Sequence, residues 1–161
     1  MDAKTLRLAL GLAAVAIVIF LAQLWQPARQ VRLHQEHFLK AVAKRNWEKV
    51  GHFIAAEYHD RWGHDKENVL AQSAQVFGHF LFCNIQSEER SLVLENGRAT
   101  MGAKLAMGGT GSPLADYVTQ RVNALTEPFV FKWVRKSWKP WDWELTEVNQ
   151  PQLEISEMRD F

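Results

Sequence analysis

The residues best suited to chemistry lie in a short polar segment, EYHDRWGHD, at positions 57–65. Asp60 stands two residues after Tyr58 and two residues before Trp62. A carboxylate in such a setting can act as a general base while a neighbouring hydroxyl or indole N–H orients the substrate. A polar loop that closes a helical layer explains the same residues equally well. Tyr58 and Asp60 are therefore the candidate catalytic residues, and both interpretations stay open.

The sequence contains six histidines, which are common metal ligands, but their spacing does not predict a metal site. His34 and His37 could share a helix face, and His59 and His64 flank Asp60 in the polar segment. Zinc enzymes use defined spacings such as HExxH, and the sequence contains none. We therefore expect no metal ion and no other cofactor.

Motifs for nucleophilic and phosphate chemistry are also missing. The sequence has no GxSxG motif, and GGTGSP at 108–113 lacks the lysine and the spacing of a phosphate-binding loop. The single cysteine, Cys83, lies in the apolar run FLFC, four residues after His79. A lone cysteine in such a run is typical of a small core residue.

An uncharged apolar run, LALGLAAVAIVIFLAQLW, extends from Leu8 to Trp25. As a helix with a rise of ~1.5 Å per residue, it nearly spans the hydrocarbon core of a bilayer. Lys4 and Arg7 also fit a cleavable secretory signal, but the exit AQLWQPARQ lacks a small-x-small cleavage site. A buried soluble helix is disfavoured because the run has no polar stripe. We expect residues 1–7 to be a short tail and residues 8–26 to be a transmembrane helix in contact with the lipid bilayer.

Charge constrains both the orientation and the partners of the chain. Basic residues lie on both sides of the apolar run, so the short N-terminal tail decides in favour of a cytoplasmic N-terminus and an extracytoplasmic domain. The formal charge of +1 disappears when the first 26 residues are set aside, because they hold two basic residues and one acidic residue. Nucleic-acid binding needs a clustered basic excess, so we expect no nucleic-acid partner.

The stretch that begins at Pro27 predicts three helices. Apolar residues recur at helical spacing over residues 27–44 and again after Asn46, which is a favourable N-cap residue. Asp65 is a second expected cap, for a helix that ends near Gly78. The residues expected on the buried side of that third helix are Val69, Leu70, Ser73, Val76 and Phe77.

From Phe80 onward the apolar period changes from about 3.6 residues to 2, which predicts strands. Asn96-Gly97 is a strong hairpin signal, because both turn positions need a positive φ. Ser112-Pro113 predicts the start of a helix that runs to about Leu125. The segment EPFVFKWVRKSWKPWDWEL then predicts a hairpin around Lys139-Pro140, with its aromatic residues on one face. The residues expected to share the inward face are Phe129, Phe131 and Trp133 on the first strand and Trp141, Trp143 and Leu145 on the second.

This order of elements resembles the nuclear transport factor 2-like (NTF2-like) superfamily, which includes SnoaL-like and ketosteroid-isomerase-like proteins. The resemblance covers roughly residues 30–148 and rests on FLKAVAKRNWEKVGHFIAAEYHDRWG and FVFKWVRKSWKPWDWEL. It implies an α+β fold in which three N-terminal helices pack on a cone-shaped, curved antiparallel sheet. The expected domain spans residues 27–150, and residues 151–161 are expected to form a C-terminal tail.

The resemblance also implies a conical cavity between the sheet and the helices, which holds an apolar ligand in enzymes of the superfamily. The residues expected to line it are Trp62, Phe80, Met101, Phe131, Trp133 and Trp143. The isomerases place a carboxylate base beside a tyrosine and a protonated acid. That trio cannot be placed here, since Asp142 and Glu144 fall on the parity opposite to the core aromatics. Asp60, beside Tyr58, is the one acid near a tyrosine at the expected cavity mouth.

Two classes of function remain. The first is a non-catalytic, membrane-anchored protein-interaction or assembly module, with a protein partner or a second copy of the chain on the sheet. The second is a binder of a small apolar ligand, or a SnoaL-like isomerase or hydrolase, that uses the cone pocket. The neutral charge, the missing trio and the apolar run favour the first class. A binder should have an open cavity with a few convergent polar groups and a strongly shifted pKa, whereas an interaction module should have that space filled by tryptophans and should carry an exposed apolar patch or sheet face.

Overall fold

The computed structural model describes residues 3–153, and side chains are described from residue 9 onward except at position 24. The expected C-terminal tail, residues 151–161, lies mostly outside the described residues. The described part of the chain forms an α+β fold with five helices and a four-stranded antiparallel sheet. This confirms the α+β part of the predicted fold class, a curved antiparallel sheet packed by helices.

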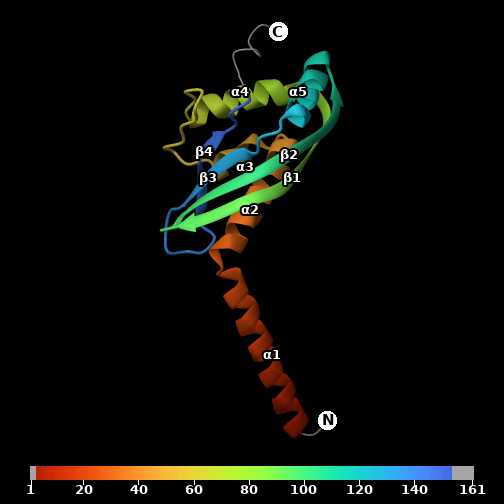
Figure 1. Cartoon of the computed structure of the whole chain (residues 1–161). Coiled ribbons are helices and arrows are strands. Elements are labelled where there is room, and N and C mark those ends of the chain that lie inside the picture. The colour runs from red at the N-terminus through yellow and green to blue at the C-terminus, as the bar shows by residue number, and fades with distance from the viewer. Residues whose placement is uncertain (1–2, 154–161) are drawn as a thin grey trace.

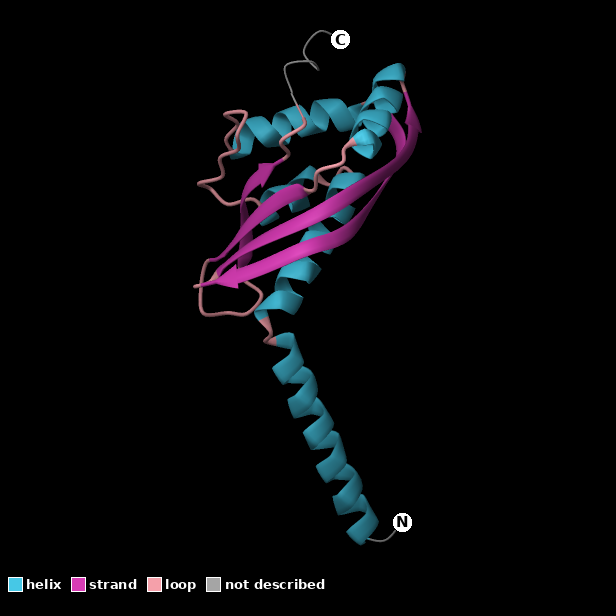
Figure 2. Ribbon diagram, in the orientation of Figure 1, coloured by secondary structure: helices cyan, strands magenta, loops and turns pink. Residues whose placement is uncertain are grey.

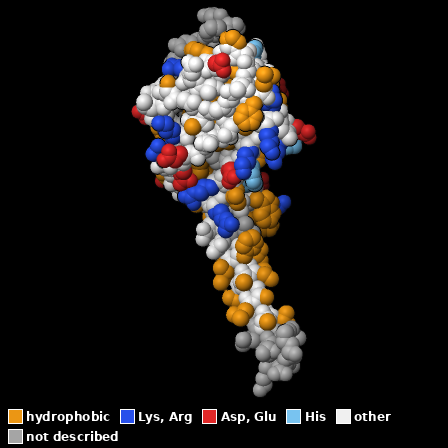
Figure 3. All heavy atoms as spheres, turned by 90° about the vertical axis from the view of Figure 1, so that its right-hand side faces the viewer, with side chains coloured by type: hydrophobic (Ala, Val, Ile, Leu, Met, Phe, Trp, Pro, Cys, Tyr) orange, Lys and Arg blue, Asp and Glu red, His pale blue; other side chains and the backbone are white. Residues whose placement is uncertain are grey.

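Helix α1 (Ala3–Leu24) projects away from the rest of the molecule (Figure 1). Its side chains over residues 9–23 are exposed all round, including Leu12 and Val18. Figure 3 shows apolar side chains along this projecting helix, with charged side chains gathered on the domain. Among the described residues no single helix meets the length and hydropathy needed to cross a bilayer, and one pair bent by 70°, Ala9–Gln23 with Pro27–Ala43, meets them jointly. The transmembrane helix at residues 8–26 therefore stays a prediction.

Three further helices cover one face of the sheet (Figure 2). They are α2 (Pro27–Ala43), α3 (Trp47–Phe53) and α4 (Lys66–Gly78). The side chains of Asn46 and Asp65 each accept a hydrogen bond from the backbone N–H three residues later, at 3.0 and 2.9 Å. Both predicted helix starts are thus confirmed, together with their physical cause.

The sheet follows the order of the sequence. Its strands are β1 (Phe80–Glu95), β2 (Arg98–Gly111), β3 (Phe129–Arg135) and β4 (Trp143–Asn149). β1 and β2 are long and curve around the helices (Figure 2), and β1 contains two register shifts of the kind that bend a strand. Asn96 and Gly97 have φ values of 48° and 75°, which confirms the predicted turn between them.

Helix α5 (Pro113–Ala124) leaves the end of β2 and folds back onto the domain. The core lies between α2 and the sheet, where Trp133, Phe131 and Leu145 are almost completely buried. β4 also ties down the chain after α3, because the backbone N–H groups of Ala55 and His59 donate to carbonyls of β4 at 2.9 and 3.1 Å. The polar segment that follows is therefore held against the sheet.

The final hairpin differs from the prediction at one aromatic residue. Trp133 and Trp143 are buried, but Trp141 is 57% exposed. β4 begins at Trp143, two residues later than the parity argument assumed, so Trp141 belongs to the connecting loop. Opposite charges pair across these two strands, with Lys132 Nζ 2.7 Å from a carboxylate oxygen of Glu147.

Candidate ligand-binding site

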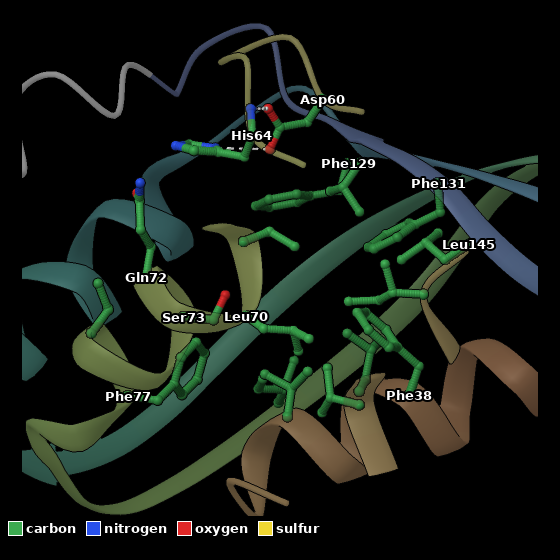
Figure 4. A pocket seen from close by; sticks show the side chains of 18 of the residues that line it. Phe38, Asp60, His64, Leu70, Gln72, Ser73, Phe77, Phe129, Phe131 and Leu145 are labelled. Carbon is green, nitrogen blue, oxygen red and sulfur yellow. Dashed lines mark hydrogen bonds and ion pairs between the residues drawn. The ribbon is translucent and has the colours of Figure 1, made fainter. Parts of the chain in front are cut away.

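A cavity of about 270 Å³ lies between the concave face of the sheet and helices α2–α5. Its wall is almost entirely apolar. Residues that line it include Phe38, Leu70, Phe77, Phe129, Phe131 and Leu145 (Figure 4). The strands supply one side, and α4 together with residues of α2, α3 and α5 supplies the rest, so the cavity occupies the space that the concave sheet leaves open.

Helix α4 is the least buried wall of this cavity, since none of its residues is fully buried. The face that the sequence predicts to be buried nevertheless points inward. Val69, Leu70, Ser73, Val76 and Phe77 all line the cavity. These side chains are half-buried because they border open space instead of close-packed protein.

The polar segment closes one end of the cavity and is organised by Asp60 (Figure 4). The side chain of Asp60 is 1% exposed. Oδ1 accepts the backbone N–H groups of Trp62 and His64, both at 2.9 Å. Oδ2 accepts His64 Nδ1 at 3.0 Å and the Tyr58 hydroxyl at 3.5 Å. An ionised carboxylate has about four acceptor positions, and these donors fill them. Asp60 is therefore placed to orient its neighbours, and not to take a proton from a ligand.

His64 is the residue in this group that sequence reasoning considered only as a metal ligand. Because a carboxylate only accepts hydrogen bonds, the contact at 3.0 Å assigns the proton to Nδ1. That tautomer leaves Nε2 as a proton acceptor, and the imidazole is itself buried. His64 also lines the cavity. The four-residue spacing of DRWGH, with a glycine before the histidine, is the sequence signal that could have indicated this pair.

Tyr58 is buried against the cavity and the carboxylate. Burial, and after it the negative charge of Asp60, raise the pKa of the Tyr58 phenol far above its ordinary value. The hydroxyl stays protonated at every physiological pH and donates to Asp60. The structure therefore brings the two candidate residues Tyr58 and Asp60 together. Asp60 also accepts a hydrogen bond from His64, so the three side chains form one hydrogen-bonded group.

The six residues expected to line the cavity separate into two sets. Trp62 and Phe131 line it. Phe80, Met101, Trp133 and Trp143 do not, and each is at most 3% exposed within the packed core. Parity along the strands identifies the inward face, but it does not tell which inward residues meet open space. The indole of Trp133 donates instead to Gln35 Oε1 at 3.2 Å, beneath α2.

The remaining candidate groups stand apart from one another. Within the described residues no three His, Cys, Asp or Glu side chains are grouped so as to hold a metal ion. His34 Nδ1 lies 2.8 Å from the carbonyl of Gln30, one helical turn earlier. Burial raises the pKa of the Cys83 thiol, which makes it a poor nucleophile. His79 contacts the hydroxyl of Ser112 at 3.1 Å.

Comparisons with known proteins define the fold. No family profile matches the sequence, and no curated protein matches it. Solved structures do. A conserved protein from Planctomyces limnophilus aligns with a TM-score of 0.59 and 14% identity, over 76% of this chain and 93% of the other. An NTF2-like protein from Cytophaga hutchinsonii aligns with a TM-score of 0.52 and 11% identity, over 74% and 93%.

A third similar structure carries a functional name. It is a Streptomyces avermitilis protein named provisionally as a dehydratase from the NTF2-like family. The TM-score is 0.56 and the identity is 14%, over 76% of this chain and 93% of the other. At these identities the likeness shows the NTF2-like fold and does not show an activity.

Proposed function

We propose that this chain binds a small apolar molecule in the cavity under α4, and that α1 holds the domain at a membrane. The observation that carries the proposal is the apolar cavity of about 270 Å³. An apolar cavity of about 150 Å³ stays dry and binds benzene, and drug-sized ligands occupy roughly 300 Å³ or more. The cavity therefore suits a molecule with a single ring, a molecule with two fused rings, or a short acyl chain.

The membrane part of the proposal is supported by α1. Its apolar side chains from Leu10 to Leu21 are about half exposed or more, and Figure 1 shows α1 projecting away from the domain. Such a surface is unfavourable in water and favourable in a bilayer. A helix of 22 residues is ~33 Å long, close to the thickness of the hydrocarbon core. An extracytoplasmic domain remains our proposal for the orientation.

If the chain were a non-catalytic interaction module, as the sequence favours, we would expect its own tryptophans to fill this space. Trp133 and Trp143 fill the core, but the space under α4 stays open. The shifted pKa of Tyr58 beside the cavity is a second mark of a binding site. Ligand binding accounts for both features, so we place it ahead of the protein-interaction role.

A thermal-unfolding experiment tests the binding proposal. The full chain is reconstituted in lipid nanodiscs and unfolded with and without tetralone, an apolar bicyclic ketone. A ligand at 100 times its Kd stabilises the folded state by about 2.7 kcal/mol. Ser73→Phe places an aromatic ring in the cavity, and Gln75→Phe places the same ring on the exposed side of α4. We expect a shift in Tm for wild type and Gln75→Phe but not for Ser73→Phe. An equal shift in both variants, or none in wild type, would contradict the proposal.

The Asp60–His64 pair favours acid–base chemistry as a second candidate function. His64 lines the cavity, and with Nδ1 donating to Asp60 the neutral imidazole keeps Nε2 as the nitrogen that can accept a proton from a carbon acid. The dehydratase name of the Streptomyces avermitilis neighbour fits such a proton abstraction. The test is exchange of the acidic C–H protons of tetralone with deuterium from D₂O. We expect exchange with wild type, loss of exchange in His64→Ala, and retention of the ligand-induced Tm shift in that variant.

A further inference from the structure

The loop between β3 and β4 holds two tryptophans out in solvent. Trp138 is 73% exposed and Trp141 is 57% exposed. A tryptophan side chain offers 150 Å² or more of surface, of the order of several kcal/mol of burial energy at about 25 cal/mol per Å². Two of them on one short loop form an apolar patch that the domain itself does not cover.

The loop is held in this conformation by its own hydrogen bonds. The backbone N–H of Lys136 donates to the carbonyl of Asp142 at 2.8 Å, which closes the loop. The indole of the buried Trp143 donates to the carbonyl of Pro140 at 2.9 Å. The Lys136 ammonium pairs with Glu57 and, at 3.8 Å, with Glu144. The outward position of the two tryptophans is therefore built into the hairpin.

The loop lies at the end of the domain from which α1 leaves (Figure 1). The same end carries the β1–β2 turn, because the backbone N–H of Arg135 donates to the carbonyl of Gly97 at 2.8 Å. A third exposed tryptophan, Trp25, is 54% exposed and directly follows α1. Three exposed tryptophans thus occur at the level where the apolar helix meets the domain.

The chemistry of this end matches the headgroup region of a bilayer. Tryptophan is enriched at membrane interfaces because its ring is apolar and its N–H is polar. Exposed Arg98, Arg135 and Lys139 stand beside exposed Glu57 and Glu95 at the same end, so this surface carries charges of both signs, as zwitterionic headgroups do. Helix α4 lies at the opposite end of the domain (Figure 1).

We infer that the loop at residues 136–142 inserts Trp138 and Trp141 into the headgroup region of the bilayer that holds α1. The inference rests on the proposed membrane role of α1 and adds a second contact to it. Two contacts fix the tilt of the domain, whereas a single helix followed by the bend at Pro27 does not. In this orientation α4 and the cavity behind it face the aqueous phase.

Fluorescence quenching on the full chain tests the inference. A nitrobenzoxadiazole probe is attached at Lys139→Cys or at Gln120→Cys, each in a Cys83→Ser background. Gln120 is exposed on α5, far from the loop. The proteins are reconstituted into vesicles of phosphatidylcholine and phosphatidylglycerol in equal parts that carry a headgroup nitroxide lipid. We expect loss of fluorescence at position 139 and none at position 120.

A matched pair of double variants separates the tryptophans from general hydrophobicity. Trp138→Ser with Trp141→Ser is expected to abolish the quenching at position 139. Leu81→Ser with Phe82→Ser removes an equally exposed apolar pair from the start of β1, at the other end of the domain, and is expected to leave it unchanged. Circular dichroism checks that each variant is folded.

The outcomes distinguish this inference from the anchor on which it rests. If the chain does not float with vesicles, the membrane role of α1 fails and the inference fails with it. If the chain floats but the two probes are quenched equally, or neither is quenched, the loop contact is overturned and the anchor stands. Self-quenching of the position-139 probe that rises with protein density would assign the loop to contact between copies, and would also overturn the inference.

Discussion

His64 Nδ1 lies 3.0 Å from Asp60 Oδ2, while Asp60 Oδ1 receives the backbone N–H groups of Trp62 and His64 at 2.9 Å each. One carboxylate therefore fixes the shape of the loop and the orientation of the imidazole at the same time. Any chemistry at His64 depends on a residue that also holds one end of the cavity closed.

Asp60→Ala is expected to lower the free energy of unfolding by about 3 kcal/mol, because it leaves the buried N–H of His64, the part-buried N–H of Trp62 and the imidazole without an acceptor. Asp65→Ala removes an exposed helix cap five residues away and is expected to lower it by about 1 kcal/mol. Denaturant titration monitored by circular dichroism measures both. Equal losses in the two variants would show that Asp60 has no more than an ordinary capping role.

The buried phenol of Tyr58 predicts a pH dependence of stability. Below pH 10 Tyr58 is protonated in both states, and its contribution to stability is fully present. As the pH rises above 10, the unfolded state releases this proton and the folded state keeps it, since the folded pKa is raised. The free energy of unfolding then falls by about 1.4 kcal/mol per pH unit on account of this group.

Tyr58→Phe removes that titration while keeping the ring. We expect wild type to lose stability more steeply than Tyr58→Phe above pH 10, and the two proteins to show parallel profiles between pH 7 and 9. Urea titrations at a series of pH values measure the difference. Parallel profiles throughout would mean that the phenol is not buried.

Local signals in the sequence predicted the elements around the site. Asn46 and Asp65 cap their helices, Asn96-Gly97 makes its turn, and Phe129, Phe131 and Trp133 share the buried face of β3. Each of these depends on neighbours within four residues, so the chain order alone carries the information.

The site itself depends on distances that chain order does not contain. Phe80 and Phe131 are both inward-facing aromatics, but only Phe131 lines the cavity. The difference comes from the curvature of the sheet and the position of α4, which are tertiary features. The same holds for Trp141, whose exposure follows from where β4 begins and not from its parity.

Helix α4 is expected to be the part of the cavity wall that opens. None of its residues is fully buried, whereas α2 buries six. Helices with few buried contacts exchange their amide hydrogens through low-energy local opening. Hydrogen exchange followed by mass spectrometry should show faster exchange over residues 66–78 than over residues 30–41. Tetralone should slow the exchange of α4 selectively, and equal protection of both helices would contradict a role for α4 as the entry to the cavity.

Gly111 is expected to be essential for the junction between β2 and α5. A Cβ at this position would lie 2.1 Å from the carbonyl oxygen of His79 and 2.9 Å from Cα of Phe80, and both atoms belong to the backbone. The clash would disturb the hydrogen bond from the N–H of Ser112 to the same carbonyl, at 3.0 Å, which starts α5. Gly111→Ala should therefore lower the free energy of unfolding by about 3 kcal/mol.

Gly108 on the same strand provides the matched control, because a Cβ there meets no atom within 4 Å. Gly108→Ala should leave stability within about 0.5 kcal/mol of wild type. Since Val118 and Val122 of α5 line the cavity, Gly111→Ala should also weaken the Tm shift produced by tetralone, and Gly108→Ala should preserve it. If Gly111→Ala unfolded like Gly108→Ala and kept the full ligand response, the close contact between β1 and the start of α5 would not determine the shape of the cavity.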